Sequence, residues 1–200
     1  MIDILKYSYR SKIISFFIQN ILRINTENLS KPFFFKKNIN LEFDNKFFYD
    51  YLNKNTITKW SGKNPGEHYQ SNHNLQKIDS LQKSIKLLEN YLNNEVKVDI
   101  FKNSKIGRFK IKSLWFTIQK SNQGHSKHNH PKSVLTGVYY QQIDENKGGE
   151  LEIFLKDKIL EYTPKKNDLI IFNSETFHSV KPYYGKDDRI AIAWDAIYTF

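Results

Sequence analysis

The half of the chain that follows Val96 is a succession of short strand-like segments with turn-forming residues between them. The segments are rich in β-branched and aromatic residues, and glycine or proline separates most of them. We predict strands at 111–119, 134–143, 150–155, 169–173, 177–180 and 189–199. Many short strands in succession favour a mainly β fold, a sandwich or barrel of antiparallel strands.

The half before Val96 has a different pattern and is expected to brace the β-rich part. Six apolar residues recur at three- and four-residue spacing, which predicts an amphipathic helix. These residues are Leu75, Ile78, Leu81, Ile85, Leu88 and Leu92. Residues 32–52 are typical of short strands and aromatic-rich turns, and residues 53–74 of a polar loop. We therefore predict a helical and loop region over 1–95 that packs on a core over 96–200, as one integrated domain.

The first apolar stretch, residues 2–24, is interrupted by basic and amide side chains. Its unbroken apolar part is far shorter than the ~20 residues that a membrane span needs, and no small-residue cleavage site follows. We expect no membrane span here, and instead an amphipathic helix packed on the domain. An organelle-targeting or interfacial role is the alternative.

Composition narrows the classes of function. The chain has no cysteine, which excludes a disulfide scaffold, a thiolate zinc site and a cysteine nucleophile, and suits the reducing cytoplasm where we expect the protein. The net charge is +10, from 31 basic and 21 acidic residues, yet only four of the basic residues are arginines. Nucleic-acid binders use arginine for phosphate and base contacts, so a nucleic-acid partner is not expected. The charge slightly favours an acidic substrate.

Four of the six histidines lie in the β-rich half. His125, His128 and His130 stand within six residues, and His178 follows 48 residues after His130. Residues i and i+2 of an extended segment face the same way, so His128 and His130 can point together, and His178 can complete a set of three ligands. Three imidazoles suit Fe, Zn, Cu or Ni and leave positions on the metal open. The alternative is a histidine-rich surface loop without a metal.

Five fragments in a fixed order extend this pattern. They are 124–131 with its histidines, 133–140, 148–154, 168–182 with His178, and 189–194. In this order and spacing, residues 111–197 resemble the Fe(II)/2-oxoglutarate-dependent oxygenases, and above all the family described as "putative 2-oxoglutarate–Fe(II) oxygenase". The Gly-Gly-Glu-Leu stretch at 148–151 and the last fragment, 189–194, are also similar to the corresponding segments of prolyl-4-hydroxylase-like members. The resemblance implies a double-stranded β-helix, which is a jelly-roll or cupin-like barrel, with Fe(II), 2-oxoglutarate and O₂ as cofactor and co-substrates.

The resemblance also implies a ligand set. The superfamily usually carries His-x-Asp or His-x-Glu where this chain has His128 and His130. His130 can coordinate and give a three-His centre, or it can leave a two-His site that water or halide completes. In a third interpretation His125 is the ligand instead. Because the His-x-His-Pro form matches the pattern of the resembled family, we favour coordination by His128, His130 and His178.

A site for 2-oxoglutarate follows from the same resemblance. Arg189 lies 11 residues after His178, where the superfamily places the basic residue that pairs with the distal carboxylate of 2-oxoglutarate. A planar guanidinium binds such a carboxylate through two parallel hydrogen bonds. The alternative for Arg189 is an ion pair with Asp187 or Asp188.

A second contact to the co-substrate is expected from the segment 135–140. Tyr139 and Tyr140 alternate faces, so only one of them can face the interior of the barrel. We favour Tyr139, which shares a face with Leu135 and Gly137, and Thr136 is a lesser candidate.

Other polar residues are expected to have lesser roles. Asp168 and Glu150 match turns of the resembled family and are expected to be structural. His68 and His73 are expected on the surface of the upstream loop. Residues 60–75 of that loop are a candidate lid over the mouth of the barrel.

The implied function is that of an oxidoreductase, a dioxygenase that hydroxylates its substrate and releases succinate and CO₂. A small molecule, a peptide and a protein side chain are all open as substrates. The alternatives are a cupin-like three-His dioxygenase that needs no 2-oxoglutarate, and a metal-binding barrel without catalysis. The sequence specifies neither the substrate nor the oligomeric state.

Overall fold

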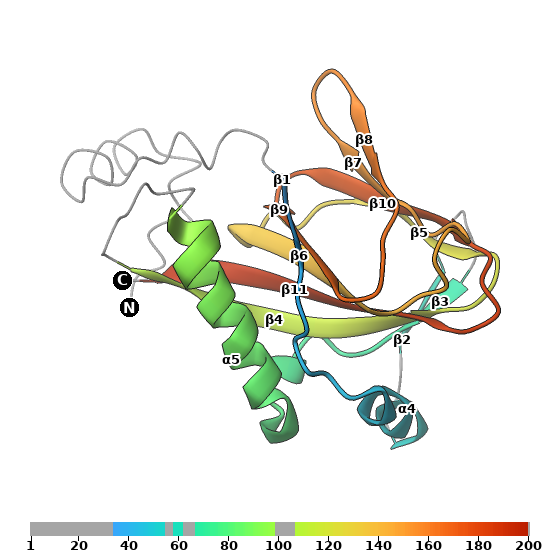
Figure 1. The fold of residues 1–200 in the computed structure, drawn as a ribbon, viewed down its shortest axis with the longest axis horizontal. Coiled ribbons are helices and arrows are strands. Elements are labelled where there is room, and N and C mark those ends of the chain that lie inside the picture. The colour runs from blue at the N-terminus through green and yellow to red at the C-terminus, as the bar shows by residue number, and fades with distance from the viewer. Residues whose placement is uncertain (1–33, 55–57, 62–66, 99–106, 200) are drawn as a thin grey trace.

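The computed structural model describes residues 34–54, 58–61, 67–98 and 107–199, and their strands form two antiparallel sheets (Figure 1). The larger sheet has the strand order β1-β9-β6-β11-β4-β3-β2. Its strands are β1 (Phe34–Asn38), β2 (Thr58–Ser61), β3 (Glu67–Gln70), β4 (Arg108–Gln119), β6 (Leu135–Gln142), β9 (Asp168–Asn173) and β11 (Arg189–Thr199). The smaller sheet has the order β5-β10-β7-β8. Its strands are β5 (Gln123–His128), β7 (Leu151–Phe154), β8 (Ile159–Tyr162) and β10 (Phe177–Tyr183).

The six strands predicted after Val96 are confirmed as β4, β6, β7, β9, β10 and β11. Two further strands of this half, β5 and β8, were not predicted. The residues of β5, Gln-Gly-His-Ser-Lys-His, include no β-branched or aromatic hydrocarbon side chain, so its strand character comes from pairing with β10.

A helical segment covers the outer face of the larger sheet, as Figure 1 shows for α5. The segment begins with two short 3₁₀ turns, η1 (Leu75–Lys77) and η2 (Asp79–Leu81), continues as α5 (Gln82–Tyr91) and ends in the π-helical turn η3 (Leu92–Val96). Leu81, Ile85, Leu88 and Leu92 are all buried against the sheet. The predicted amphipathic helix is therefore confirmed, and its apolar stripe is the part that the sheet buries.

Residues 45–54 form a second helix, α4 (Asn45–Lys54), where we predicted short strands and turns. Asp44 caps this helix, because its carboxylate accepts a hydrogen bond from the backbone N–H of Lys46 at 2.9 Å. Phe47 and Tyr51 lie one helical turn apart, with ring centroids separated by 5.9 Å. The aromatic content of the segment suggested strands, whereas the cap and the four-residue spacing favoured a helix.

The N-terminal half contributes strands as well as helices. β1 pairs with β9 at one edge of the larger sheet, and β3 pairs with β4 near the other edge. The interpretation of residues 53–74 as a polar loop is therefore wrong over β2 and β3. The predicted helix over residues 2–24 and part of the candidate lid, residues 62–66, lie outside the described residues.

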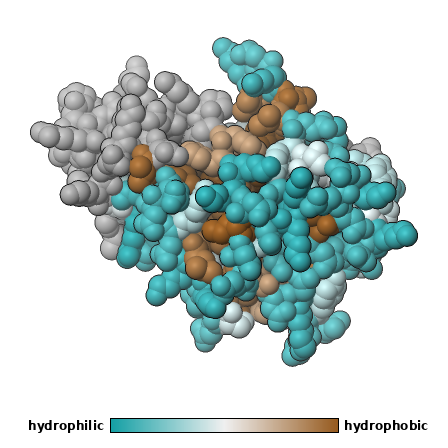
Figure 2. Space-filling view, viewed as in Figure 1, coloured by the Kyte–Doolittle hydropathy of each residue, from teal (hydrophilic) through white to brown (hydrophobic). Residues whose placement is uncertain are grey.

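Two hydrophobic clusters lie on opposite faces of the larger sheet. One joins the helices to the sheet and includes Phe48, Leu88 and Phe116. The other lies between the two sheets and includes Ile153 and Phe172. On the face seen in Figure 2, hydrophilic residues predominate and hydrophobic ones gather in a few small areas. None of the described helices has the length and apolar character needed to cross a bilayer.

Candidate metal centre

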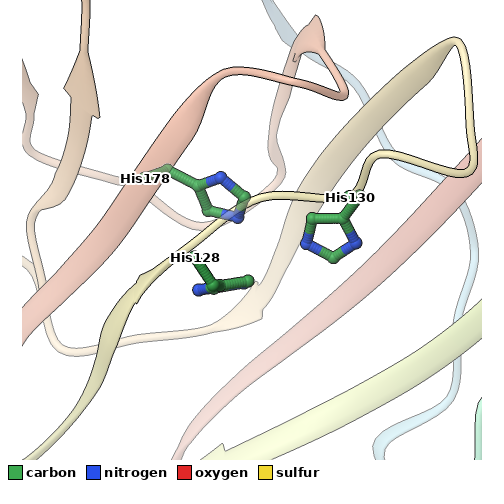
Figure 3. Close-up of side chains that lie close together, drawn as sticks. All are labelled: His128, His130 and His178. Atoms are coloured by element: carbon green, nitrogen blue, oxygen red, sulfur yellow. The ribbon is translucent and has the colours of Figure 1, made fainter.

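The structure brings His128, His130 and His178 together between the two sheets (Figure 3). His128 ends β5, and His178, the second residue of β10, stands directly opposite it in the antiparallel ladder. His130 lies two residues beyond β5, where its backbone N–H donates to the carbonyl of Ser174 at 2.7 Å. One ring nitrogen of each histidine lies within 4.8 Å of the other two. Three nitrogen ligands at this separation can bind one divalent ion.

Two of these histidines have a ring nitrogen held by a backbone carbonyl. Nδ1 of His128 donates to the carbonyl of Ser126 at 2.8 Å, and Nδ1 of His178 donates to that of Thr176 at 3.0 Å. A carbonyl oxygen only accepts, so the proton of each neutral ring lies on Nδ1. Each Nε2 therefore keeps its lone pair for a metal.

The third histidine is held by a carboxylate. Nδ1 of His130 lies 3.1 Å from one oxygen of Asp195, and the ring stacks on Trp115 at a centroid separation of 5.5 Å. The same argument places the proton of His130 on Nδ1. All three rings thus present Nε2, and the donor set fits a metal that prefers imidazole, such as Fe(II).

Burial keeps His128 and His178 neutral. Desolvation lowers the pKa of His128 to about 4 and that of His178 well below its usual value. It also lowers the pKa of the neighbouring His125 to about 2. At neutral pH, His128 and His178 are therefore in the neutral form that binds metals.

The three histidines line an open cavity between the two sheets. Its walls come from β4, β6, β9 and β11 of the larger sheet and from β5, β7 and β10 of the smaller one. Among the described residues, no carboxylate lines the cavity, and the one lining residue with a permanent charge is Arg189. The cavity therefore favours an anionic ligand.

Arg189 begins β11 and is 2% exposed. Its guanidinium donates to the side-chain oxygen of Gln119, while its Nε has no hydrogen-bond partner among the described residues. No described carboxylate forms an ion pair with it, and Asp188 pairs instead with Lys120 at 4.0 Å. A buried guanidinium without an anion is costly, so this arrangement fits a ligand that brings a carboxylate of its own.

Gly149 leaves room for the side chain of Arg189 to pack closely against the backbone. Gly149 has a φ of +75°, and a Cβ there would stand 3.2 Å from Nε of Arg189. Ala191 and Ala193 follow on the cavity face of the same strand, and their small side chains leave space between Arg189 and the histidines.

Tyr140, and not Tyr139, faces the cavity, so the preference for Tyr139 is corrected here. Tyr139 packs on the helix side of the sheet, where its hydroxyl donates to the side-chain oxygen of Asn167 at 2.7 Å and its ring lies 5.8 Å from that of Phe43. The ring centroid of Tyr140 lies 5.0 Å from the guanidinium carbon of Arg189. Alternation along β6 was expected, but the face that turns inward is the opposite one.

The hydroxyl of Tyr140 is buried, and the polar group beside it is the guanidinium of Arg189, which can only donate to it. Burial raises its pKa to about 12, so the phenol keeps its proton and can donate to an anion beside Arg189. Thr136 also lines the cavity, but its hydroxyl donates to the backbone carbonyl of Trp194 at 3.1 Å.

The other three histidines of the chain lie near this centre, and of the two expected on the surface His73 is exposed as expected, whereas His68 is buried. His68 is 2% exposed, and its ring lies 4.8 Å from that of His125. His125 lines the cavity beside His128, with ring centroids 4.1 Å apart. His73 is exposed, but it stacks on Trp115 at 4.3 Å. His68 is buried because it lies on β3, in the segment that was interpreted as a polar loop.

The acidic residues considered as structural lie away from the three histidines. The carboxylate of Asp168 accepts hydrogen bonds from Asn38, Tyr162 and the backbone N–H of Lys165. The backbone carbonyl of Glu150 accepts from the N–H of Lys181 at 2.9 Å. Asp195 was not singled out from the sequence.

With this geometry established, comparison with known proteins identifies the fold. Residues 113–195 match the model of the family described as "Putative 2OG-Fe(II) oxygenase". A search among curated proteins finds no match.

Solved structures of oxygenases share the fold at low sequence identity. A prolyl-4-hydroxylase from Pseudomonas putida superposes with a TM-score of 0.60 at 12% identity, covering 88% of this chain and 97% of that chain. A Trichoplax adhaerens prolyl hydroxylase, solved in complex with a hypoxia inducible factor peptide fragment, gives 0.60 at 15% identity, with 96% and 95% covered. The viral collagen prolyl hydroxylase of Paramecium Bursaria Chlorella virus-1, solved as a 2OG complex, gives 0.55 at 15%, with 84% and 96% covered. The double-stranded β-helix expected from the sequence is thus confirmed.

Proposed function

Residues 113–195 of this chain belong to the 2OG-Fe(II) oxygenase superfamily, and from this premise we propose that the protein uses Fe(II), 2-oxoglutarate and O₂ to hydroxylate a substrate. Succinate and CO₂ are the expected co-products. His128, His130 and His178 are the proposed metal ligands, and Arg189 is the proposed anchor of 2-oxoglutarate.

The observation that carries this proposal is one cavity with the three histidines at one part and Arg189 at another. A dicarboxylate is the ligand class that suits both. One end, an oxo acid, chelates a metal, and the other end forms a charge-assisted pair with a guanidinium. The free Nε of Arg189 and the hydroxyl of Tyr140 are donors for the second end.

Bound Fe(II) with 2-oxoglutarate would supply the activation of O₂ for oxidation of a substrate C–H bond. The chain's own residues bind and orient 2-oxoglutarate and shield it from water. Arg189 orients the distal carboxylate, and Ala191 and Ala193 leave room for the acid. Leu151, Phe172 and Val180 line the cavity with hydrocarbon, which excludes water and strengthens the charged contacts.

The relatives illustrate the range of substrates without selecting one. The Trichoplax adhaerens enzyme was solved with a peptide fragment, and HygX from Streptomyces hygroscopicus with hygromycin B. We propose a small molecule or a peptide for this chain, with an acidic one slightly favoured by the net charge of +10.

The absence of a carboxylate ligand favours one alternative, a three-His dioxygenase that needs no 2-oxoglutarate. The two functions differ in what binds beside the metal. Arg189 has a role in the first and none in the second.

An anaerobic titration of apo-protein with Fe(II) and then 2-oxoglutarate tests the proposal. We expect a metal-to-ligand charge-transfer band in the visible spectrum, lost or weakened in Arg189→Ala and partly retained in the charge-conserving Arg189→Lys. Loss of the band in His130→Ala would show that this ring is a ligand. Stoichiometric Fe(II) binding without a band would refute the use of 2-oxoglutarate and favour the three-His dioxygenase. Absence of metal binding would leave a barrel without this chemistry.

A further inference from the structure

Asp195 is a buried carboxylate directly behind one of the three proposed ligands. It lies on β11, opposite Thr136 of β6 and Ser113 of β4, and is 8% exposed. Its position continues the alternation of Arg189, Ala191 and Ala193, which all face the cavity. One strand therefore carries the anchor for the co-substrate at its start and a carboxylate six residues later, about 20 Å along the strand.

The contacts of Asp195 are few and are directed at His130. Its two carboxylate oxygens lie 3.1 and 3.3 Å from Nδ1 of His130, and the hydroxyl of Ser113 donates to one of them at 3.2 Å. Among the described residues, no lysine or arginine forms an ion pair with Asp195. His130 is thus the group through which this buried charge acts.

The three rings differ in this respect. Nδ1 of His128 and Nδ1 of His178 each donate to a neutral backbone carbonyl, whereas Nδ1 of His130 donates to a carboxylate. Asp195 is not itself a member of the group of potential ligands, which consists of the three histidines. The negative charge therefore lies one ring away from the metal position, behind the imidazole that stands where the superfamily usually has Asp or Glu.

We propose that Asp195, through the Nδ1–H of His130, supplies the negative charge that a carboxylate ligand would bring to this metal centre. The proposal rests on the proposed function for the identity of the metal, but not for the contact itself. A carboxylate that accepts from Nδ1–H raises the basicity of Nε2 and fixes the orientation of the ring. Packing adds to this orientation, because His130 lies between Trp115, at 5.5 Å and 18°, and His178, at 5.2 Å and 15°.

The test compares Asp195→Asn with wild type, His130→Ala and the double variant, all as full-length chains. Asparagine conserves the shape and an accepting oxygen but removes the charge. We expect Co(II), measured by chelator competition, to bind roughly ten- to a hundredfold more weakly to Asp195→Asn. In the His130→Ala background, Asp195→Asn should cause no further loss of Co(II) affinity. Ser113→Ala is the matched control, because it removes the other hydrogen bond of Asp195 and leaves its charge, so Co(II) affinity should stay near wild type.

A spectroscopic readout separates an electronic effect from a merely structural one. With less negative charge behind His130, the d electrons of Fe(II) are held more tightly, so the charge-transfer band to bound 2-oxoglutarate should move to higher energy in Asp195→Asn. An unchanged band with unchanged Co(II) affinity would overturn the proposal. Equal losses of affinity in the wild-type and His130→Ala backgrounds would also overturn it, because Asp195 would then act without His130.

A measurement on wild type keeps the proposal testable if Asp195→Asn fails to fold. In the zinc-loaded protein with ¹⁵N-labelled histidine, the Nδ1–H of His130 should resonate furthest downfield among the ligand rings and be absent in His130→Ala. A His130 ring bound to zinc through Nδ1 would refute the contact. The Co(II) and zinc arms need no 2-oxoglutarate, so a missing charge-transfer band in wild type would refute the proposed function while leaving this inference standing.

Discussion

The burial of His68 makes the apo-protein sensitive to acid by an amount that can be calculated. His68 lies on β3, is 2% exposed and has a pKa lowered to about 4, chiefly by burial. In the unfolded chain its pKa is about 6.5. Between these values the unfolded state binds a proton that the folded state does not, so the free energy of unfolding falls as the pH falls.

The size of this effect follows from the two pKa values. Between pH 8 and pH 5.5, His68 alone should lower the free energy of unfolding by about 1.4 kcal/mol, since a pKa of 6.5 leaves about ten in eleven unfolded molecules protonated at pH 5.5. The result barely depends on the folded pKa as long as that value is below about 5.

Urea unfolding of the apo-protein in the presence of a chelator measures this loss in the free energy of unfolding. Wild type and His68→Gln are compared at both pH values, because glutamine is polar, neutral and does not titrate in this range. The substitution itself changes the free energy of unfolding by an amount that is the same at both pH values. The other histidines contribute equally to the pH dependence of both proteins, so both effects cancel when the two losses are compared. Wild type should lose about 1.4 kcal/mol more than the variant on acidification. Parallel losses in the two proteins would refute a neutral, buried His68.

Three further outcomes are expected. Gly149→Ala should weaken 2-oxoglutarate binding, because its Cβ would stand 3.2 Å from Nε of Arg189 at a φ of +75°; an unchanged dissociation constant in the charge-transfer titration would count against this contact. Tyr140→Phe should weaken 2-oxoglutarate binding in the same titration, whereas Tyr139→Phe should leave it intact and lower the free energy of urea unfolding by about 1 kcal/mol through loss of a hydrogen bond; the reverse pattern would restore Tyr139 to the cavity. Co(II) at a hundredfold excess over its dissociation constant should stabilise wild type by about 2.7 kcal/mol and raise its Tm, reversibly with a chelator; equal stabilisation of His178→Ala would place the ion elsewhere.

The strands of the β-rich half could be predicted because their residues are largely β-branched and aromatic and are separated by residues that break strands. The same was true of the helix over 82–91, where Ile85, Leu88 and Leu92 form one stripe. The helix over 45–54 was missed because aromatic residues suit both structures, and the cap formed by Asp44 decides between them only once the chain around it is placed.

Alternation along β6 could be predicted, but not which face turns inward. Leu135, Gly137 and Tyr139 do share a face, yet that face packs against the helices, where Phe43 lies 5.8 Å from the Tyr139 ring. Both faces of β6 are buried, because one packs against the helices and the other lines the cavity between the two sheets. The sequence of this strand therefore has no polar face from which the cavity side could be predicted.

The sequence by itself determined the order of the strands along the chain and the spacing that puts His128 and His130 near a common point, because both depend on neighbours only a few residues apart. The tertiary structure decided which distant groups complete the centre. Antiparallel pairing sets His178 opposite His128, β3 carries His68 beneath His125, and β11 places Asp195 behind His130. These contacts join residues from about 50 to 65 positions apart, and they depend on sheet register, which the pairing of whole strands sets and no local pattern encodes.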